Sequence, residues 1–360
     1  MVIQDSARSK KIKSLLSEAV AMQIGSGMVA AWGDFSDWSG VSVVFAGTES
    51  LISSNKTDQN TVFDLASLTK ILATTALYMK WVESGLIDLD SLYPAREFTF
   101  RQLLAHSSGL PAWKPFYEEM ISHFGSDRAL IQTPIQERKN YFYDLVSNVP
   151  VERAPGEKIV YSDLGFILLG KHAEKITGIS LDELLKREVW NGINGCELEY
   201  RPLSSRRNVL AGIAATENCP WRGLLQGEVH DDNAWSMGGV AGHAGVFGSV
   251  NDVIAWVRAL VEGKIAGFAT LRKFSESQSD SFGARRALGF DVPAVDGTGS
   301  TGFVFPSSSI GHLGFVGTSL WIDLDQGRFA ILLTNRVHPS REDIRIRDLR
   351  RAFHQALSVP

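Results

Sequence analysis

Hydrophobic residues recur along the chain with two different periods, one typical of helices and one typical of strands. Residues 6–24 place apolar side chains at helical spacing and end at Gly25–Gly27, which predicts an amphipathic helix. Two short β-rich runs follow at 28–32 and 41–47, joined by a polar turn. The start of the chain is therefore expected to form a helix and a pair of strands.

Helical patterns dominate the middle of the chain, and strand patterns return near its end. After an apolar helical run from about 63 to 84, proline and glycine turns separate further predicted helices at 98–111, 127–149, 161–178 and 180–190. A glycine-rich stretch at 236–248 then precedes a predicted helix at 249–263. The last predicted elements are strands at 311–324 and 327–337 and a closing helix from about 341 to 357.

This distribution predicts an α+β architecture, because β-forming segments at both ends can pair in one sheet. We expect an antiparallel sheet flanked by the N- and C-terminal helices, with a mainly helical lobe inserted. The predicted α/β lobe comprises 1–62 and 245–360, and the predicted helical lobe comprises 63–244. A cleft between such lobes is where a site is expected.

Composition excludes several classes of protein. The chain has 360 residues, a net charge of -4 and 44% hydrophobic residues, which fits a globular protein and not a nucleic-acid partner. Basic residues in the closing helix are balanced by acids, so a solvated face is expected there. The two cysteines are expected to be reduced. No signal-like segment and no stretch of roughly 18 apolar residues is present, which predicts a cytoplasmic protein without a membrane partner.

One lysine stands out in the apolar run FDLASLTKILATTALYM at 63–79. Lys70 follows Ser67 by three residues, so a helix would place the ammonium and the hydroxyl on one face, a turn apart. The alternative is that Ser67 caps the helix and Lys70 extends to solvent. The pattern S-x-x-K also occurs at 53–56, but there it lies in a polar loop and carries no such geometry.

Two other short motifs fit chemistry around Lys70. Tyr161-Ser162-Asp163 opens a helical run and offers partners for a buried ammonium, although Tyr161 could also pack at a corner and Asp163 cap the helix. His312-Leu313-Gly314 lies on a predicted edge strand, where the backbone N–H of Phe315 and that of Ser67 could form an oxyanion hole. Gly314 would let a substrate approach the backbone, and His312 alone also fits an ordinary strand histidine.

Taken together, the three motifs resemble the serine β-lactamase and penicillin-binding-protein superfamily. The resemblance is strongest to the branch of class C β-lactamases, D-Ala-D-Ala carboxypeptidases, D-aminopeptidases and related esterases, whose pattern is S-x-x-K, Y-x-N and K/H-x-G. FDLASLTK, LLAHSSGLP, GHLGFVGTSLWIDL and ILLTNRVHP carry it over about 60 to 340. The resemblance implies a β-lactamase/transpeptidase-like fold.

The resemblance also implies the roles of the site residues. Ser67 would be the acylated nucleophile, Lys70 and Tyr161 the acid/base pair, and the N–H groups of Ser67 and Phe315 the oxyanion hole. Which of Lys70 and Tyr161 is the base stays open. Burial lowers the pKa of a lysine and a nearby ammonium lowers that of a phenol, so we expect one shared proton. The chemistry needs no metal and no cofactor.

Two positions depart from the family pattern. Asp163 stands where the pattern has asparagine, and a carboxylate cannot donate a hydrogen bond to a substrate. His312 stands where many lactamases have lysine, so a fixed positive charge becomes one expected to titrate near pH 6.5. Both changes argue against an efficient β-lactamase and favour an esterase, amidase or peptidase.

A polar stretch at 216–245 contains five residues that could be metal ligands: Glu217, His230, Asp231, Asp232 and His243. None of them is paired at a recognised metal-ligand spacing, so a metal is not expected. We expect a loop that lines the cleft, with His243 or Asn233 facing the substrate. An equally plausible alternative is that this loop packs against the lobes and does not face a substrate.

The sequence therefore predicts a serine hydrolase that acts through an acyl-enzyme on an amide or ester. A small molecule or peptide is the expected partner, and a D-amino-acid peptide or peptidoglycan fragment is the expected class. The rival from another class is a ligand-binding or scaffold protein of the same fold that has lost turnover. An α/β-hydrolase is excluded because no G-x-S-x-G elbow is present. The scissile bond and the oligomeric state stay open.

Overall fold

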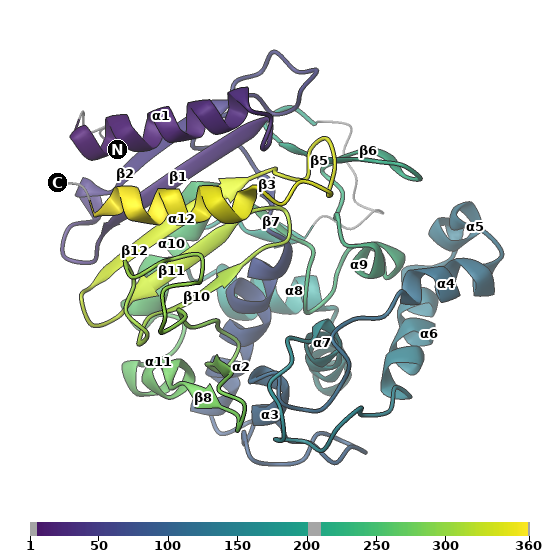
Figure 1. Ribbon diagram of the computed structural model, residues 1–360. Helices are drawn as coiled ribbons and strands as arrows, with labels where there is room; N and C mark the ends of the chain where they lie inside the picture. Colours follow the sequence, from purple (N-terminus) through teal and green to yellow (C-terminus); the bar gives the residue numbers. More distant parts are fainter. Residues whose placement is uncertain (1–5, 201–209, 359–360) are drawn as a thin grey trace.

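A five-stranded antiparallel sheet forms the centre of the molecule (Figure 1). The computed structural model describes residues 6–200 and 210–358. The strand order is β10-β11-β12-β1-β2, so the two ends of the chain pair side by side. The strands are β1 (Gly27–Asp34), β2 (Ser42–Gly47), β10 (Ile310–Leu313), β11 (Ser319–Asp323) and β12 (Arg328–Thr334). The predicted α+β architecture is confirmed.

Both faces of this sheet are buried. In β1, Met28 and Ala30 belong to one hydrophobic core and Val29 and Ala31 to the other, as the alternation of side chains along a strand requires. Helices α1 (Ala7–Ala21) and α12 (Ile346–Leu357) lie together over the first face (Figure 1). The second face packs against the helical part of the molecule, which places the free edge of β10 beside that part.

The other helices have the following bounds: α2 (Ala76–Glu83), α3 (Phe100–Leu104), α4 (Phe116–Phe124), α5 (Asp127–Gln132), α6 (Ile135–Ser147), α7 (Asp163–Thr177), α8 (Leu181–Leu185), α9 (Asp232–Ser236), α10 (Val250–Val261) and α11 (Phe268–Ser275). Helices α4, α5 and α6 lie at the periphery, away from the sheet (Figure 1). Of the described residues, no helix is both long and apolar enough to cross a membrane. The cytoplasmic location stays a prediction, and so do the lobe boundaries.

Short strands form three smaller sheets. They are β3 (Phe63–Asp64), β7 (Val246–Gly248) and β4 (Glu199–Tyr200) in one sheet, β5 (Ala215–Cys219) with β6 (Gly223–Gln226), and β8 (Gln278–Ser279) with β9 (Arg285–Arg286). The prediction of a loop over 216–245 is therefore wrong in part, because this stretch holds the β5–β6 hairpin and α9. Asp231 caps α9 by accepting a hydrogen bond from the backbone of Ala234. Both cysteines are free thiols, as predicted.

The segment that carries Ser67 is not the regular α-helix that its hydrophobic pattern predicts. Ala66–Leu68 form a 3₁₀ turn and Lys70–Thr75 form a π-helical turn before α2 begins. Turns of the π type are frequent at functional sites, where they change the spacing of side chains. Gly85 follows α2 with a φ of 75°, as expected for a glycine that ends a helix.

Candidate active site

A cavity of about 740 Å³ lies between the edge strand β10 and the helical part of the molecule. Ser67, Tyr161, Asp163, His312, Gly314 and Phe315 all line it. Three motifs that are far apart in the sequence therefore meet at one cavity. Its volume falls in the range of small-molecule sites in proteins.

Ser67 and Lys70 are in direct contact. The Lys70 Nζ atom donates to Ser67 Oγ at 3.0 Å and to the backbone oxygen of His243 at 3.2 Å. The same Nζ atom lies 2.7 Å from Asp163 Oδ1. The Lys70 side chain is completely buried, so the alternative in which it extends to solvent is wrong. A buried ammonium needs such partners because water no longer solvates it.

The residue before Ser67 has an unusual backbone. Ala66 has a φ of 45°, in the left-handed region that costs a non-glycine residue about 1–2 kcal/mol. Asp64 holds this turn: its Oδ1 atom accepts from the Ala66 N–H at 2.7 Å, and its Oδ2 atom accepts from the His230 N–H at 2.7 Å. Strain beside a nucleophile is typical of functional sites. The sequence offers no signal for this turn.

Tyr161 completes the cluster around Ser67. Its ring centroid lies 4.9 Å from Lys70 Nζ. Burial raises the pKa of Tyr161, and although Lys70 and Ser67 lower it, the pKa stays above its ordinary value. Burial lowers the pKa of Lys70, but Asp163 and Tyr161 raise it by more, so the pKa of Lys70 is also raised. The resting cluster is therefore an ammonium beside a neutral phenol, whereas the sequence alone suggested a lowered pKa for each group.

Ser162 does not belong to this cluster. Its Oγ atom donates to the Pro111 oxygen at 2.7 Å, and its backbone N–H donates to His106 Nδ1 at 3.0 Å. The His106 ring in turn lies 4.7 Å from the ring of Tyr161, centroid to centroid. The expectation that the hydroxyl of Ser162 could join the partners of Lys70 is wrong. Instead, Ser162 fixes the segment from which Tyr161 and Asp163 project.

His312 lies on the sheet edge, as predicted, but it carries no useful charge. It is buried, and its Nδ1–H donates to the Leu313 oxygen at 2.9 Å. Burial lowers the pKa of His312 to about 4. The expectation that its charge titrates near pH 6.5 is therefore wrong, because a buried imidazole near other cations resists protonation.

A fixed cation at the cavity comes from an arginine that sequence reasoning missed. The guanidinium of Arg286 lies 4.7 Å from the ring centroid of Tyr161 and forms an ion pair with Asp291. Asp291 pairs with Gly311 of β10 through two backbone hydrogen bonds, at 2.7 and 3.0 Å. These residues follow no motif, so only the folded chain shows that they line the same cavity.

The turn after β10 holds the backbone N–H of Phe315 at the cavity. Among residues 6–200 and 210–358 this N–H has no hydrogen-bond acceptor. A Cβ on Gly314 would clash with Thr318 Oγ1 and approach the Leu65 oxygen, so internal packing requires this glycine. The expectation that a substrate approaches the backbone at Gly314 stays a prediction, and Gly314 does line the cavity.

An arginine of the closing helix fixes this turn. Arg350 is buried and donates to the backbone oxygens of Gly314 at 2.7 Å, Thr318 at 2.8 Å and Gly317 at 3.2 Å. Burial lowers its pKa to about 9. The prediction that the basic residues of this helix form only a solvated face is wrong at Arg350. Its donors fix the turn from the side of α12.

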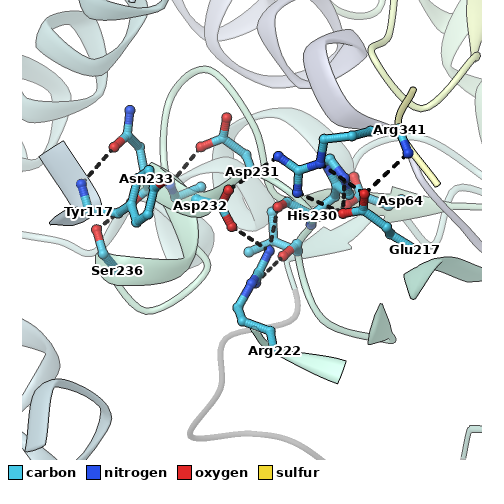
Figure 2. Close-up of polar contacts among 12 residues, drawn as sticks. Asp64, Tyr117, Glu217, Arg222, His230, Asp231, Asp232, Asn233, Ser236 and Arg341 are labelled. Atoms are coloured by element: carbon cyan, nitrogen blue, oxygen red, sulfur yellow. Dashed lines mark hydrogen bonds and ion pairs between the residues drawn. The ribbon is translucent and has the colours of Figure 1, made fainter. Parts of the chain in front are cut away.

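Asn233 and His243 do not face the cavity. The Asn233 amide is fully buried; its oxygen accepts from the backbone N–H of Tyr117 at 3.0 Å (Figure 2), and its nitrogen donates to the Lys114 oxygen at 2.9 Å. The His243 ring is also buried, and its Nε2 atom lies 2.9 Å from Asp231 Oδ1. Both side chains hold the protein together, so the expectation that one of them contacts the substrate is wrong. His243 contributes its backbone oxygen to Lys70 instead.

Two other acidic residues of 216–245, Glu217 and Asp232, form ion pairs with arginines. Figure 2 shows Glu217 between Arg341, at 2.6 Å from its Oε2 atom, and His230, at 3.0 Å. Arg222 Nη2 lies 2.9 Å from Asp232 Oδ1. Within the described ranges, no three His, Cys, Asp or Glu side chains are arranged to hold a metal. This network forms one wall of the cavity.

Comparisons with known proteins identify the fold and the family. The fold is of the β-lactamase/transpeptidase type. A family model described as "Beta-lactamase" matches residues 22–355, and the chain belongs to the β-lactamase family.

Two curated relatives and one solved structure are similar to most of the chain. A Salmonella heidelberg protein provisionally named D-alanyl-D-alanine carboxypeptidase is 27% identical over 78% of this chain and 70% of that protein. N-acetylmuramyl-L-alanine amidase of Bacillus subtilis is 28% identical over 83% of this chain and 73% of the relative. The structure of D-amino acid amidase from Ochrobactrum anthropi has a TM-score of 0.70 at 19% identity, with 98% of both chains covered.

Proposed function

We propose that this chain is a serine hydrolase that works through an acyl-enzyme on Ser67. The observation that carries the proposal is the contact of 3.0 Å between Lys70 Nζ and Ser67 Oγ at the floor of a cavity. A completely buried lysine bonded to a serine has no simple structural explanation, since a neutral side chain would fill the same space at lower cost. Acid/base catalysis at the Ser67 hydroxyl explains why the lysine is buried there.

In the proposed reaction, Ser67 Oγ attacks the carbonyl carbon of an amide or ester. Its proton passes into the cluster of Lys70, Tyr161 and Asp163, and the carbonyl oxygen becomes an oxyanion held by the N–H groups of Ser67 and Phe315. The carbon–nitrogen or carbon–oxygen bond then breaks, and the cluster returns a proton to the leaving group. A water molecule releases the acid from Ser67 by the same steps.

Asp163 sets the protonation state of this cluster. Because Asp163 raises the pKa of both Lys70 and Tyr161, the active form requires loss of one proton from the coupled pair. The rate is therefore expected to rise with pH. Whether that proton leaves Lys70 or Tyr161, the acceptor for the Ser67 proton is the pair and not either residue alone.

For the substrate, we propose an amide bond in a peptide that contains a D-amino acid, such as a peptidoglycan fragment. Relatives named for a carboxypeptidase and a muramyl amidase support this class, and the D-amino acid amidase shares the fold. Asp163 lacks the amide donor of the family pattern, and His312 is neutral, so we expect weak turnover of β-lactams. An ester with the same acyl group is the expected surrogate substrate.

The mechanism is tested by labelling the protein with a fluorophosphonate. Intact-mass and peptide mass spectrometry should find one adduct, on the peptide that contains Ser67, and none on the Ser67→Ala variant. Ser53→Ala is the matched control, because Ser53 belongs to the other S-x-x-K match and should leave labelling unchanged. A folded wild-type protein that gives no adduct on Ser67 would refute the proposal.

The rival function is a ligand-binding or scaffold protein without turnover. It predicts equal hydrolysis of short acyl esters and D-Ala peptides by the wild type and by Ser67→Ala. A wild-type rate above that of the variant excludes this rival. The buried Lys70 argues against it, since a silent protein gains nothing from that ion pair.

A further inference from the structure

A second cavity, of about 710 Å³, is lined in part by the segment 228–235. Its walls come from α5, from the start of α6, from α9 and from the turn between β5 and β6. The two cavities share no lining residue, but this segment borders both: His230 and Asp232 line the first, and Glu228 and Trp235 the second. The second cavity is therefore separate from the Ser67 site and close to it.

Arg138 of α6 lines this second cavity and has no partner among the described residues. Its side chain is buried, with 2% of the residue exposed, yet its Nε and Nη1 atoms make no hydrogen bond. Among the described residues no ion pair includes Arg138. Burial lowers the pKa of its guanidinium, and no carboxylate raises it. Lys139, the next residue, shows the ordinary arrangement, because its buried ammonium lies 2.5 Å from Glu174 Oε1.

The acidic residues of this cavity do not neutralise Arg138. Asp127 is exposed and accepts a hydrogen bond from the Arg128 backbone at 2.7 Å, whereas Glu228 has interactions of its own. In the part of the chain that the structure describes, neither of them forms an ion pair with Arg138. The positive charge of Arg138 thus has no counter-charge within residues 6–200 and 210–358.

The rest of the cavity combines apolar and aromatic surface with a second guanidinium. Trp221 and Trp235 meet edge to face at 5.1 Å, and Arg222 lies 5.4 Å from each ring centroid. Trp221 and Ile131 are 39% and 47% exposed, which leaves apolar surface for a ligand. Arg222 is held by Asp232, but its Nε atom is also buried without a partner. Arg138 and Arg222 both line the cavity, and each has one or more guanidinium nitrogen atoms without a partner among the described residues.

We propose that this cavity is a second binding site, for a small organic anion whose carboxylate or phosphate group pairs with Arg138 and whose ring lies against Trp221. An unpaired guanidinium away from water is unfavourable, and an oxyanion would satisfy it with charge-assisted hydrogen bonds. The exposed part of Trp221, whose ring already stacks on Tyr117 at 5.7 Å, favours a ligand with a flat or apolar body over an inorganic ion. The site is independent of the chemistry at Ser67.

The test measures binding of phenylacetate and phenyl phosphate to the full chain by isothermal titration calorimetry. The two probes separate a carboxylate ligand from a phosphate ligand, and phenylacetamide is the neutral control. Arg138→Met keeps the shape of the stem and removes the charge, so it should weaken binding of the better anion by about tenfold to a hundredfold. Arg128→Met removes an exposed charge from the neighbouring helix and should leave binding unchanged.

Two further arms keep the outcome decisive. Arg138→Lys keeps the charge and should retain part of the affinity, which also controls for misfolding of Arg138→Met. Fluorophosphonate labelling of Ser67 blocks the first cavity and should leave anion binding intact. Equal binding by the wild type and Arg138→Met would overturn the proposal, and so would loss of binding on labelling of Ser67. Failure of both anions to bind the wild type would also overturn it.

Discussion

The Ser67 cavity and the Arg138 cavity are almost equal in volume, about 740 and 710 Å³. They differ in whether the buried cation at each cavity has a charged partner. Lys70 and Arg138 are both buried cations. Lys70 lies 2.7 Å from a carboxylate and bonds a serine and a carbonyl oxygen. Among residues 6–200 and 210–358, the Nε and Nη1 atoms of Arg138 have no partner. The described residues therefore supply a counter-charge to Lys70 but none to Arg138.

This difference distinguishes a site arranged for chemistry from one arranged for binding. A nucleophile and its acid/base partners must be held in place before the substrate arrives, so their charges are paired within the protein. A binding site instead gains affinity when the ligand supplies the missing partner. The predictions that follow test the two arrangements by removing one charge at a time.

The largest effect is expected from Lys70→Met. Loss of the amine removes one member of the coupled pair that accepts and returns the Ser67 proton, so acylation by a fluorophosphonate should slow by about 10²–10⁴-fold. The measurement is the rate of adduct formation by mass spectrometry. Lys56→Met, in the other S-x-x-K match, is the control and should react at the wild-type rate. Unchanged acylation in Lys70→Met would show that Lys70 takes no part in the acylation of Ser67.

Arg350→Met should destabilise the protein by about 2–4 kcal/mol, because it leaves buried carbonyl oxygens without donors. The turn that holds Phe315 would loosen, so acylation should slow as well. Urea unfolding and the acylation rate are measured together. Arg351→Met, on the exposed side of the same helix, should change neither. A stability loss without a change in acylation would show that the turn is structural only.

Asp163→Asn should shift the pH dependence of acylation. Asp163 raises the pKa of Lys70 and of Tyr161, so its removal lowers both values and the active form appears at lower pH. The rising limb of the rate against pH should move down by roughly one to three units. Because His312 has a pKa of about 4, its protonation does not contribute to this limb. A limb that stays in place would contradict control of the cluster by Asp163.

The smallest effect, and one of opposite sign, is expected at Arg138. Without an added anion, Arg138→Met removes an unpaired buried charge and should stabilise the protein by about 1–2 kcal/mol. Lys139→Met, at the next position, should destabilise it, because Glu174 loses a partner at 2.5 Å. Urea unfolding of both variants measures the difference. If Arg138→Met is the less stable of the two, the contrast between the cavities fails.

Much of the fold could be predicted from local patterns. The continuous apolar run at 28–32 and the helical spacing in 6–24 report burial directly, and both elements form where they are predicted. Where the structure departs from the predicted elements, the cause is a local backbone feature that a hydrophobic pattern does not report. The run after Ala66 looks like one helix, but the strained Ala66 and a π-helical turn change its geometry.

The site was predictable only where a short motif fixes the spacing. Ser67, Lys70, Tyr161 and Asp163 were found because two motifs hold them at fixed separations along the chain. Asn233 and His243 were misassigned because a polar side chain in a glycine-rich stretch looks the same whether it faces a ligand or bonds the backbone. Nothing in the sequence signals that Arg286 and Arg350 lie beside the cavity.

The sequence by itself determined the sheet and the terminal helices, because periodicity is a local property of the chain, and the resemblance of its three motifs to one family indicated that Ser67, Lys70 and Tyr161 meet. The tertiary structure decided which charges have partners. Lys70 contacts Asp163 and Arg350 contacts three carbonyl oxygens, whereas Arg138 has no partner in the described part of the chain, although all three are basic residues on helical segments. Pairing depends on distances between segments far apart along the chain, and only the folded packing sets those distances.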